Sequence, residues 1–132
     1  MKLLVTGSRN WKDRKAIRDV LMRFSTGTIL IHGDCHGADK MAAAIGQQLG
    51  FDVRPYPADW DRYGNAAGPI RNQEIIDKEN LIGDEIDLCI AFHDDLESSK
   101  GTKDMLERAA KAGISTRLYF SRAKQPIPLS AT

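Results

Sequence analysis

The chain has almost no net charge, few cysteines, few aromatic residues and no long apolar run. With 19 basic and 18 acidic residues among 132, its net charge of +1 excludes a general attraction to nucleic acid or to an anionic membrane. Two cysteines far apart in the sequence predict free thiols in a reducing compartment. No apolar run approaches the roughly 20 residues of a membrane span, and the opening run is too short for a signal peptide. We therefore expect a cytoplasmic protein with no membrane partner, for which nucleic acid is not the favoured partner.

Short apolar runs alternate along the chain with longer segments of helical period. Strands are expected near residues 2–6, 28–32, 52–56, 87–92 and 115–120, and helices near 13–24, 38–49, 69–82 and 102–112. This alternation is typical of βα units around a parallel sheet. The sequence predicts one three-layer α/β domain over residues 1–122, with a mostly parallel sheet of about five strands and a flexible C-terminal tail over 123–132.

Residues that favour helix ends flank the expected helices. Asp13 is the expected N-cap of the first helix, and Gly50 is expected to end the second. Pro69 suits the first residue of the third helix, and Gly113 should close the fourth. Each expected helix therefore has a start or stop signal in the sequence.

Three of the expected strands run directly into loops that suit an anion. They lead into Gly7-Ser8-Arg9, His32-Gly33 and, after a polar stretch, Lys100-Gly101-Thr102. In a parallel sheet the loops that follow strands lie at the same edge, where ligands bind. Glycine lets an anion approach the N–H groups of a helix N-terminus, which carries partial positive charge. These loops predict a ligand that carries phosphate.

Four motifs in order carry a family resemblance over nearly the whole chain. They are Gly7-Ser8-Arg9-x-Trp11-x-Asp13, His32-Gly33-x-x-x-Gly37-Ala38-Asp39, Ala58-Asp59-Trp60 with Ala67-Gly68-Pro69-Ile70-Arg71-Asn72, and Gly101-Thr102. The chain resembles the YspA-type, cpYpsA-related branch of the SMF/DprA-LOG (SLOG) superfamily, which is common in bacteria and phages. The resemblance implies a Rossmann-like fold that binds nucleotides or nucleotide-derived ligands, and a homo-oligomer, which we expect to be a dimer.

Enzymes of this superfamily, named Lonely Guy, cleave the N-glycosidic bond of nucleoside monophosphates. The resemblance implies that Arg71 matches an arginine of those enzymes and that Gly101 and Thr102 match their phosphate loop. Their catalytic glutamate position holds Met105, which cannot transfer protons, and Asp104 is the nearby substitute. Arg71 and Asp104 are therefore the candidate catalytic residues.

The candidate ligand-binding residues come from the loops at the expected ligand edge and the helices that follow them. They are Gly7, Ser8, Arg9, His32, Gly33, Gly37, Asp39, Trp60, Asn72, Lys100, Gly101 and Thr102. The arginines suit bidentate phosphate binding but could equally be salt-bridge partners, and the glycines could simply make tight turns. Asp39 could cap its helix or brace the loops, and Trp60 could stack on a base or hold its loop in place. For Trp11 we favour a structural role.

The stretch that contains His32, Asp34, Cys35, His36 and Asp39 is rich in possible metal ligands. Its spacing does not match a zinc site, and no second Cys/His pair lies at a suitable distance in the sequence. We expect no metal and no cofactor. Cys35 lacks an identifiable base for nucleophilic catalysis, and Cys89 is expected in the core.

The leading prediction is the binding or sensing of a small nucleotide or nucleotide-derived ligand at the carboxyl edge of the sheet. One alternative is a nucleotide hydrolase acting on an N-glycosidic or phosphate bond, in which Arg71 stabilises charge and Asp104 or Asp94 is the acid-base group. Another is a DNA-binding or assembly module, because the superfamily includes a protein that loads single-stranded DNA. Such a module would lose binding steeply as salt rises.

Overall fold

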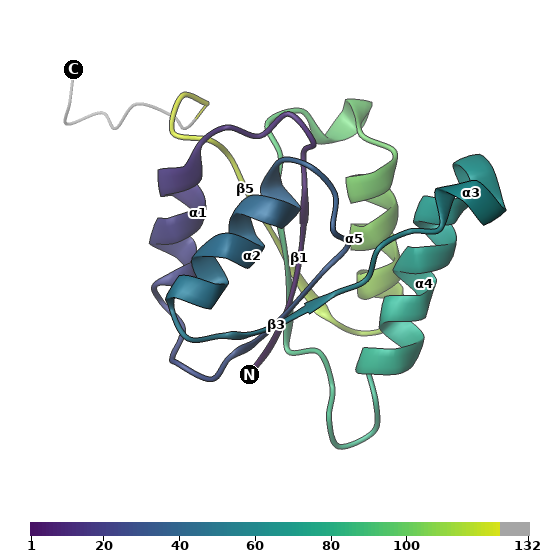
Figure 1. Cartoon of the computed structure of the whole chain (residues 1–132), viewed down its shortest axis with the longest axis horizontal. Coiled ribbons are helices and arrows are strands. Elements are labelled where there is room, and N and C mark those ends of the chain that lie inside the picture. Colours follow the sequence, from purple (N-terminus) through teal and green to yellow (C-terminus); the bar gives the residue numbers. More distant parts are fainter. Residues whose placement is uncertain (125–132) are drawn as a thin grey trace.

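Five parallel strands form one sheet in the computed structural model, which describes residues 1–124 (Figure 1). The strand order is β3-β2-β1-β4-β5. The strands are β1 (Lys2–Gly7), β2 (Ile29–His32), β3 (Asp52–Pro55), β4 (Leu88–Phe92) and β5 (Ser115–Tyr119). All neighbouring pairs are parallel, so the predicted sheet is confirmed and contains no antiparallel strand.

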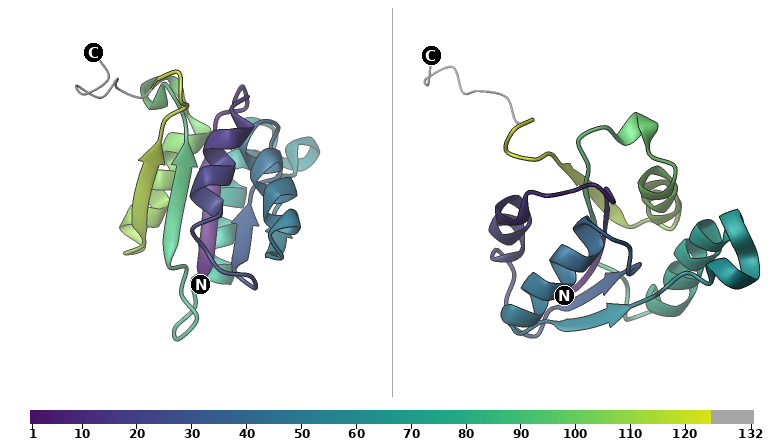
Figure 2. Two further views of the ribbon diagram at one scale, coloured as in Figure 1. Left: turned by 90° about the vertical axis from the view of Figure 1, so that its left-hand side faces the viewer. Right: turned by 45° about the horizontal axis from the view of Figure 1, so that its top comes forward.

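Helices cover both faces of this sheet (Figure 2). They are α1 (Arg14–Leu21), α2 (Ala38–Gln48), α3 (Trp60–Tyr63), α4 (Ala67–Glu79) and α5 (Gly101–Lys111), with 3-10 turns η1 (Gly64–Ala66) and η2 (Leu96–Ser98). Leu3 and Val5 of β1 pack with α1 and α2, whereas Leu4 between them packs with α4 and α5. This alternation is the two-residue period of a strand buried on both sides. The three-layer Rossmann-like prediction is confirmed.

The predicted helix ends hold at three of four positions. Asp13 caps α1 by accepting a hydrogen bond from Ala16 N at 3.2 Å, and Gly50 and Gly113 follow α2 and α5 with φ near +80° (79° and 81°). Pro69 is not the first residue of its helix, because η1 runs directly into α4 at Ala67. Proline is tolerated two residues later because the first-turn N–H groups have no partner within the helix.

The structure also bears on the expectations for the cysteines, Trp11 and the C-terminal tail. Cys35 and Cys89 are free thiols, and Cys89 is buried in the core as expected. Trp11 is 4% exposed and packs in the core, which agrees with the structural role favoured for it. Within residues 1–124, no helix has the length and apolar character needed to cross a bilayer. The tail expected over 123–132 lies outside the described residues from 125 onward.

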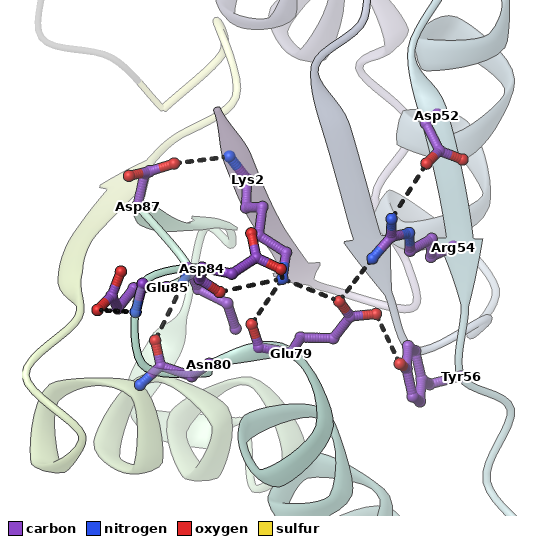
Figure 3. Close-up of polar contacts among 11 residues, drawn as sticks. Lys2, Asp52, Arg54, Tyr56, Glu79, Asn80, Asp84, Glu85 and Asp87 are labelled. Atoms are coloured by element: carbon purple, nitrogen blue, oxygen red, sulfur yellow. Dashed lines mark hydrogen bonds and ion pairs between the residues drawn. The ribbon is translucent and has the colours of Figure 1, made fainter.

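A buried ionic network lies beneath the C-terminal end of α4 (Figure 3). Glu79, 4% exposed, accepts hydrogen bonds from Arg54 Nη1 at 2.8 Å and from the Tyr56 hydroxyl at 2.6 Å. Lys2 Nζ lies 3.2 Å from Glu79 Oε1 and also donates to the Glu79 and Asp84 carbonyls. The network therefore joins β1, β3 and α4 around the buried Lys2–Glu79 pair, with the partly exposed Arg54 side chain at its edge.

Candidate functional site

A cleft of about 620 Å³ lies at the carboxyl edge of the sheet, beside the ends of β1 and β4. The chain leaves β1 toward β2 on one side, while β4 pairs with β1 on the other. Such a switch point is where ligands bind in open α/β sheets. Most of the residues expected from the sequence line the cleft: Gly7, Ser8, Arg9, Asp39, Trp60, Arg71, Asn72, Lys100, Gly101, Thr102 and Asp104.

His32, Gly33 and Gly37 do not line the cleft, although they lie next to it in the sequence. A Cβ on Gly33 would lie 2.5 Å from Arg71 Nη1, so glycine is needed there for the guanidinium to pack on the backbone. Gly37 has φ +79°, and a Cβ there would lie 2.6 Å from Arg9 O. These two glycines bring neighbouring loops together, which corresponds to the tight-turn alternative for them.

Gly101 is different, because it opens on the cleft. It begins α5, and a Cβ built on it would meet no atom within 4 Å. The next amide, Thr102 N, donates to Ser99 Oγ at 3.1 Å. The first turn of a helix offers amide groups that have no acceptor in that helix. The start of α5 thus borders the cleft at a residue without a side chain, and helix N-termini of this kind are sites where anions bind in proteins.

Arg71 is buried and holds the wall of the cleft together. Its Nη1 donates to the carbonyls of Gly33 and, at 3.2 Å, of Tyr56, and its Nε donates to Asn72 Oδ1 at 2.8 Å. Its Nη2 lies 3.8 Å from Cys35 Sγ. The guanidinium therefore contacts the protein through all three of its nitrogens, and Arg71 also lines the cleft.

Asp39 braces the loop between β2 and α2. It is 4% exposed and accepts hydrogen bonds from Gly33 N at 3.0 Å and Cys35 N at 3.4 Å. Burial raises the pKa of Asp39 to about 6, while these amides and the charge of Arg71 act in the opposite direction. These contacts correspond to the second alternative given for Asp39, that it braces the loops.

Asp104 lies on α5 at the edge of the cleft, paired with a neighbouring cation. Its Oδ2 accepts hydrogen bonds from Arg108 Nε at 2.8 Å and from Asn72 Nδ2 at 2.9 Å. Met105, at the position of the enzymes' glutamate, is 1% exposed and packs in the core between the sheet, α4 and α5. The side chain after Asp104 therefore points away from the cleft, and Asp104 is the acidic group of α5 that lines it.

Arg9 and Trp60 meet across the cleft from different elements. The Arg9 guanidinium carbon lies 5.3 Å from the centre of the Trp60 ring, which is cation–π distance. Trp60 begins α3 and is 45% exposed, and its ring is the nearest neighbour of a Cβ built on Gly68. Trp60 is therefore a partly exposed aromatic side chain with a cation over its ring, at the edge of the cleft.

Two histidines at the carboxyl ends of β2 and β4, the strands on either side of β1, share the same local geometry. Asp34 N donates to His32 Nδ1, and Asp95 N donates to His93 Nδ1, both at 2.9 Å. His32 is 2% exposed, and burial lowers its pKa, with the charge of Arg71 adding to the effect against that of Asp34. His93 is less buried and lines the cleft. The geometry is the same, but only the second ring faces the open volume.

The dense set of possible metal ligands after β2 does not converge. Within the described residues, no three His, Cys, Asp or Glu side chains lie in an arrangement that could hold a metal ion. Asp39 is occupied with backbone amides, and His32 Nδ1 accepts from the backbone.

The comparisons with known proteins agree with this geometry. The family model for the YspA, cpYpsA-related SLOG family matches residues 1–63. The Gene 61 protein of Mycobacterium phage D29 is 40% identical over 122 residues, which cover 86% of this chain and 91% of that protein. The chain belongs to this SLOG family.

The match to the SLOG family model spans β1 to α3 and so includes Arg9 in the loop after β1, Asp39 in α2 and Trp60 in α3. The other wall of the cleft, from α4 and α5, lies beyond the matched residues. Several residues that complete the lining were not among the candidate site residues predicted from the sequence: Thr6, Asn10, Cys35, Asn65, Gly68, Pro69, His93, Ser98 and Ser99. Their position in the sequence could have indicated them, because they lie in or beside the loops and motifs assigned to the ligand edge.

Proposed function

We propose that this SLOG-family protein binds a small nucleotide or nucleotide-derived ligand in the cleft at the carboxyl edge of its sheet. The observation that carries the proposal is that the β1 loop, α3 and the start of α5 meet around one open volume. A cleft of about 620 Å³ is in the size range of small-molecule sites. Family membership supports a nucleotide-related ligand.

The cations of the cleft support a phosphate position. Arg9 and Lys100 are exposed and line the cleft from opposite loops, and Gly101 leaves room at the N-terminus of α5. A chain with a net charge of +1 has no general attraction for anions, so a phosphate must be held by such a local group of donors. We place the phosphate between these three residues.

The aromatic ring of Trp60, which also lines the cleft, supports a base position. Trp60 is 45% exposed, and its partner Arg9 reaches over it from the β1 loop. Stacking of a base on such a ring contributes about 1–3 kcal/mol in nucleic-acid complexes. We place the base or sugar against Trp60, with Arg9 between base and phosphate.

Binding without bond cleavage is the reading that we favour. The motif glutamate is replaced by Met105, which is buried, and Asp104 shares its Oδ2 between Asn72 and Arg108. Hydrolysis is the second candidate, because Asp104 does line the cleft. The cytoplasmic location and the dimer stay predictions.

Titration calorimetry and native mass spectrometry with AMP, ADP, ADP-ribose, NAD and cyclic AMP test the proposal. We expect one of these to bind and to leave unchanged. Lys100→Ala should weaken that binding by about tenfold through loss of a charge-assisted contact. Lys103→Ala is the matched control, because Lys103 lies in the first turn of α5, three residues after Lys100, but pairs with Glu97 and does not line the cleft.

Three outcomes have different meanings. No binding of any compound by the wild type would overturn the proposal. Equal loss of affinity in Lys100→Ala and Lys103→Ala would move the phosphate away from the cleft. Release of free base by the wild type, abolished in Asp104→Asn, would establish the hydrolase instead.

A further inference from the structure

A second hollow of about 640 Å³ adjoins the cleft on the other side of the β1–β4 junction. It is bounded by the start of α1, the loop after β4 and the chain after β5. Four residues line both hollows: Ser8, Asn10, His93 and Ser98. His93 is the titratable residue among them and follows β4 directly, so its ring lies where the two spaces meet.

The contacts of His93 determine which ring nitrogen bears the proton. Nδ1 accepts a hydrogen bond from Asp95 N at 2.9 Å, so it cannot bear a proton of its own. In the neutral ring the proton is therefore on Nε2. Burial lowers the pKa of His93, although Asp94 and Asp95 raise it. The neutral ring thus presents Nε2–H as a donor.

His32 shows that this local geometry does not require a ligand-facing ring. Its Nδ1 accepts from Asp34 N in the same way, yet it is 2% exposed and lines neither hollow. In both His32 and His93, Nδ1 accepts from the backbone N–H two residues later, so the turn after the strand accounts for this contact. The exposure of His93 on two hollows is the additional feature, and the turn does not explain it.

We propose that His93 is a ligand-binding residue, which donates its Nε2–H to a phosphate oxygen of the ligand at the junction of the two hollows. The inference rests on the proposed function, because the phosphate is placed near Gly101 and Lys100 in the same cleft. The neutral Nε2–H of His93 would add one directional hydrogen bond to those from the charged side chains of the cleft.

Two substitutions separate the two nitrogens of this ring. In His93→Asn the amide oxygen replaces Nδ1 and keeps an acceptor for Asp95 N, but the Nε2 donor is lost. In His93→Gln the amide nitrogen replaces Nε2 and keeps a donor, but the acceptor for the loop is lost. His36→Asn is the control, because His36 is exposed and lines neither hollow.

Titration calorimetry uses whichever of AMP, ADP, ADP-ribose, NAD and cyclic AMP binds the wild type most tightly. We expect His93→Asn to weaken binding by about tenfold and His93→Gln to stay within about threefold of the wild type. Thermal unfolding should rank the variants in the reverse order, because His93→Gln loses the loop contact. His36→Asn should bind as the wild type does.

The rank order decides the inference. Wild-type affinity in His93→Asn would overturn it, and so would weaker binding in His93→Gln than in His93→Asn, which would assign the residue to loop positioning. These results leave the proposed function standing. If none of the compounds binds the wild type, the proposed function fails, and this inference fails with it.

Discussion

The two ends of α4 bury charged side chains in opposite ways. At its C-terminal end, the Glu79 carboxylate is paired with Lys2, Arg54 and Tyr56 (Figure 3). At its N-terminal end, Arg71 and its neighbours line an open cleft. Buried charge by itself therefore does not mark a functional site in this protein, because the network around Glu79 is complete without a ligand.

The pKa values of the two buried carboxylates, Glu79 and Asp39, are shifted in opposite directions. Burial alone would raise the pKa of Glu79, but the Tyr56 hydrogen bond and the charges of Lys2 and Arg54 hold it below its usual value. Asp39 has backbone amides and a single nearby guanidinium, so burial dominates and raises its pKa to about 6. At Glu79 the hydrogen bonds and neighbouring cations together outweigh burial, whereas at Asp39 burial outweighs the amides and Arg71.

Glu79→Ala should produce the largest loss of stability. Removing one partner leaves the buried Lys2 ammonium with weaker compensation, which costs on the order of 4 kcal/mol in comparable buried pairs. Urea unfolding measures the free energy of unfolding, and Glu79→Gln provides a milder variant if the alanine variant does not fold. Nucleotide affinity of the folded variants should be unchanged.

Lys78→Ala is the matched control for this prediction. Lys78 lies next to Glu79 but makes an exposed pair with Glu74, so its loss should change stability by less than about 0.5 kcal/mol. If Glu79→Ala cost no more than Lys78→Ala, the network would not be the stabilising element described. A large loss of nucleotide affinity in Glu79→Gln would break the separation between the two ends of α4.

Arg71→Ala should reduce both stability and ligand binding. It removes the donors to the Gly33 and Tyr56 carbonyls, which we expect to cost roughly 3 kcal/mol in the free energy of unfolding. It also removes the Arg71 side chain, which lines the cleft. Urea unfolding and calorimetry measured on one preparation should show both losses, whereas a loss of stability alone would make Arg71 purely a brace.

Asp39→Asn should alter how stability depends on pH. With a folded pKa of about 6 against 3.8 in the unfolded chain, folded Asp39 binds the proton more tightly between these values. This residue's contribution to stability therefore rises as pH falls from about 7 to 4, by on the order of 2 kcal/mol, and is lost as pH rises.

Urea unfolding of the wild type and Asp39→Asn at steps from pH 4 to pH 7 isolates this contribution, because other carboxylates titrate in both proteins. The wild type should gain stability relative to the variant toward pH 4. A gain toward pH 7 would mean that the amides and Arg71 outweigh burial, and Asp39 would then resemble Glu79.

Local patterns were sufficient for the strands, most helix ends and the edge at which the cleft lies. Asp13 and Gly113 act on their own neighbours, so their roles could be predicted from the sequence around them. The short helix α3 was not predicted, because four residues carry too little periodicity. The need for glycine at position 33 could not be predicted, because it arises from Arg71, which is far away in the sequence and packs directly on Gly33.

The sequence by itself determined the alternation of strands and helices, because burial period and helix-end preferences act over a few residues. It also determined which loops share an edge, since parallel strands leave them no other place. Tertiary structure alone decided that His93 faces two hollows while His32 is buried, and that Lys2 meets Glu79. Those relations depend on which elements pack together, and a packing contact between distant residues has no local signal.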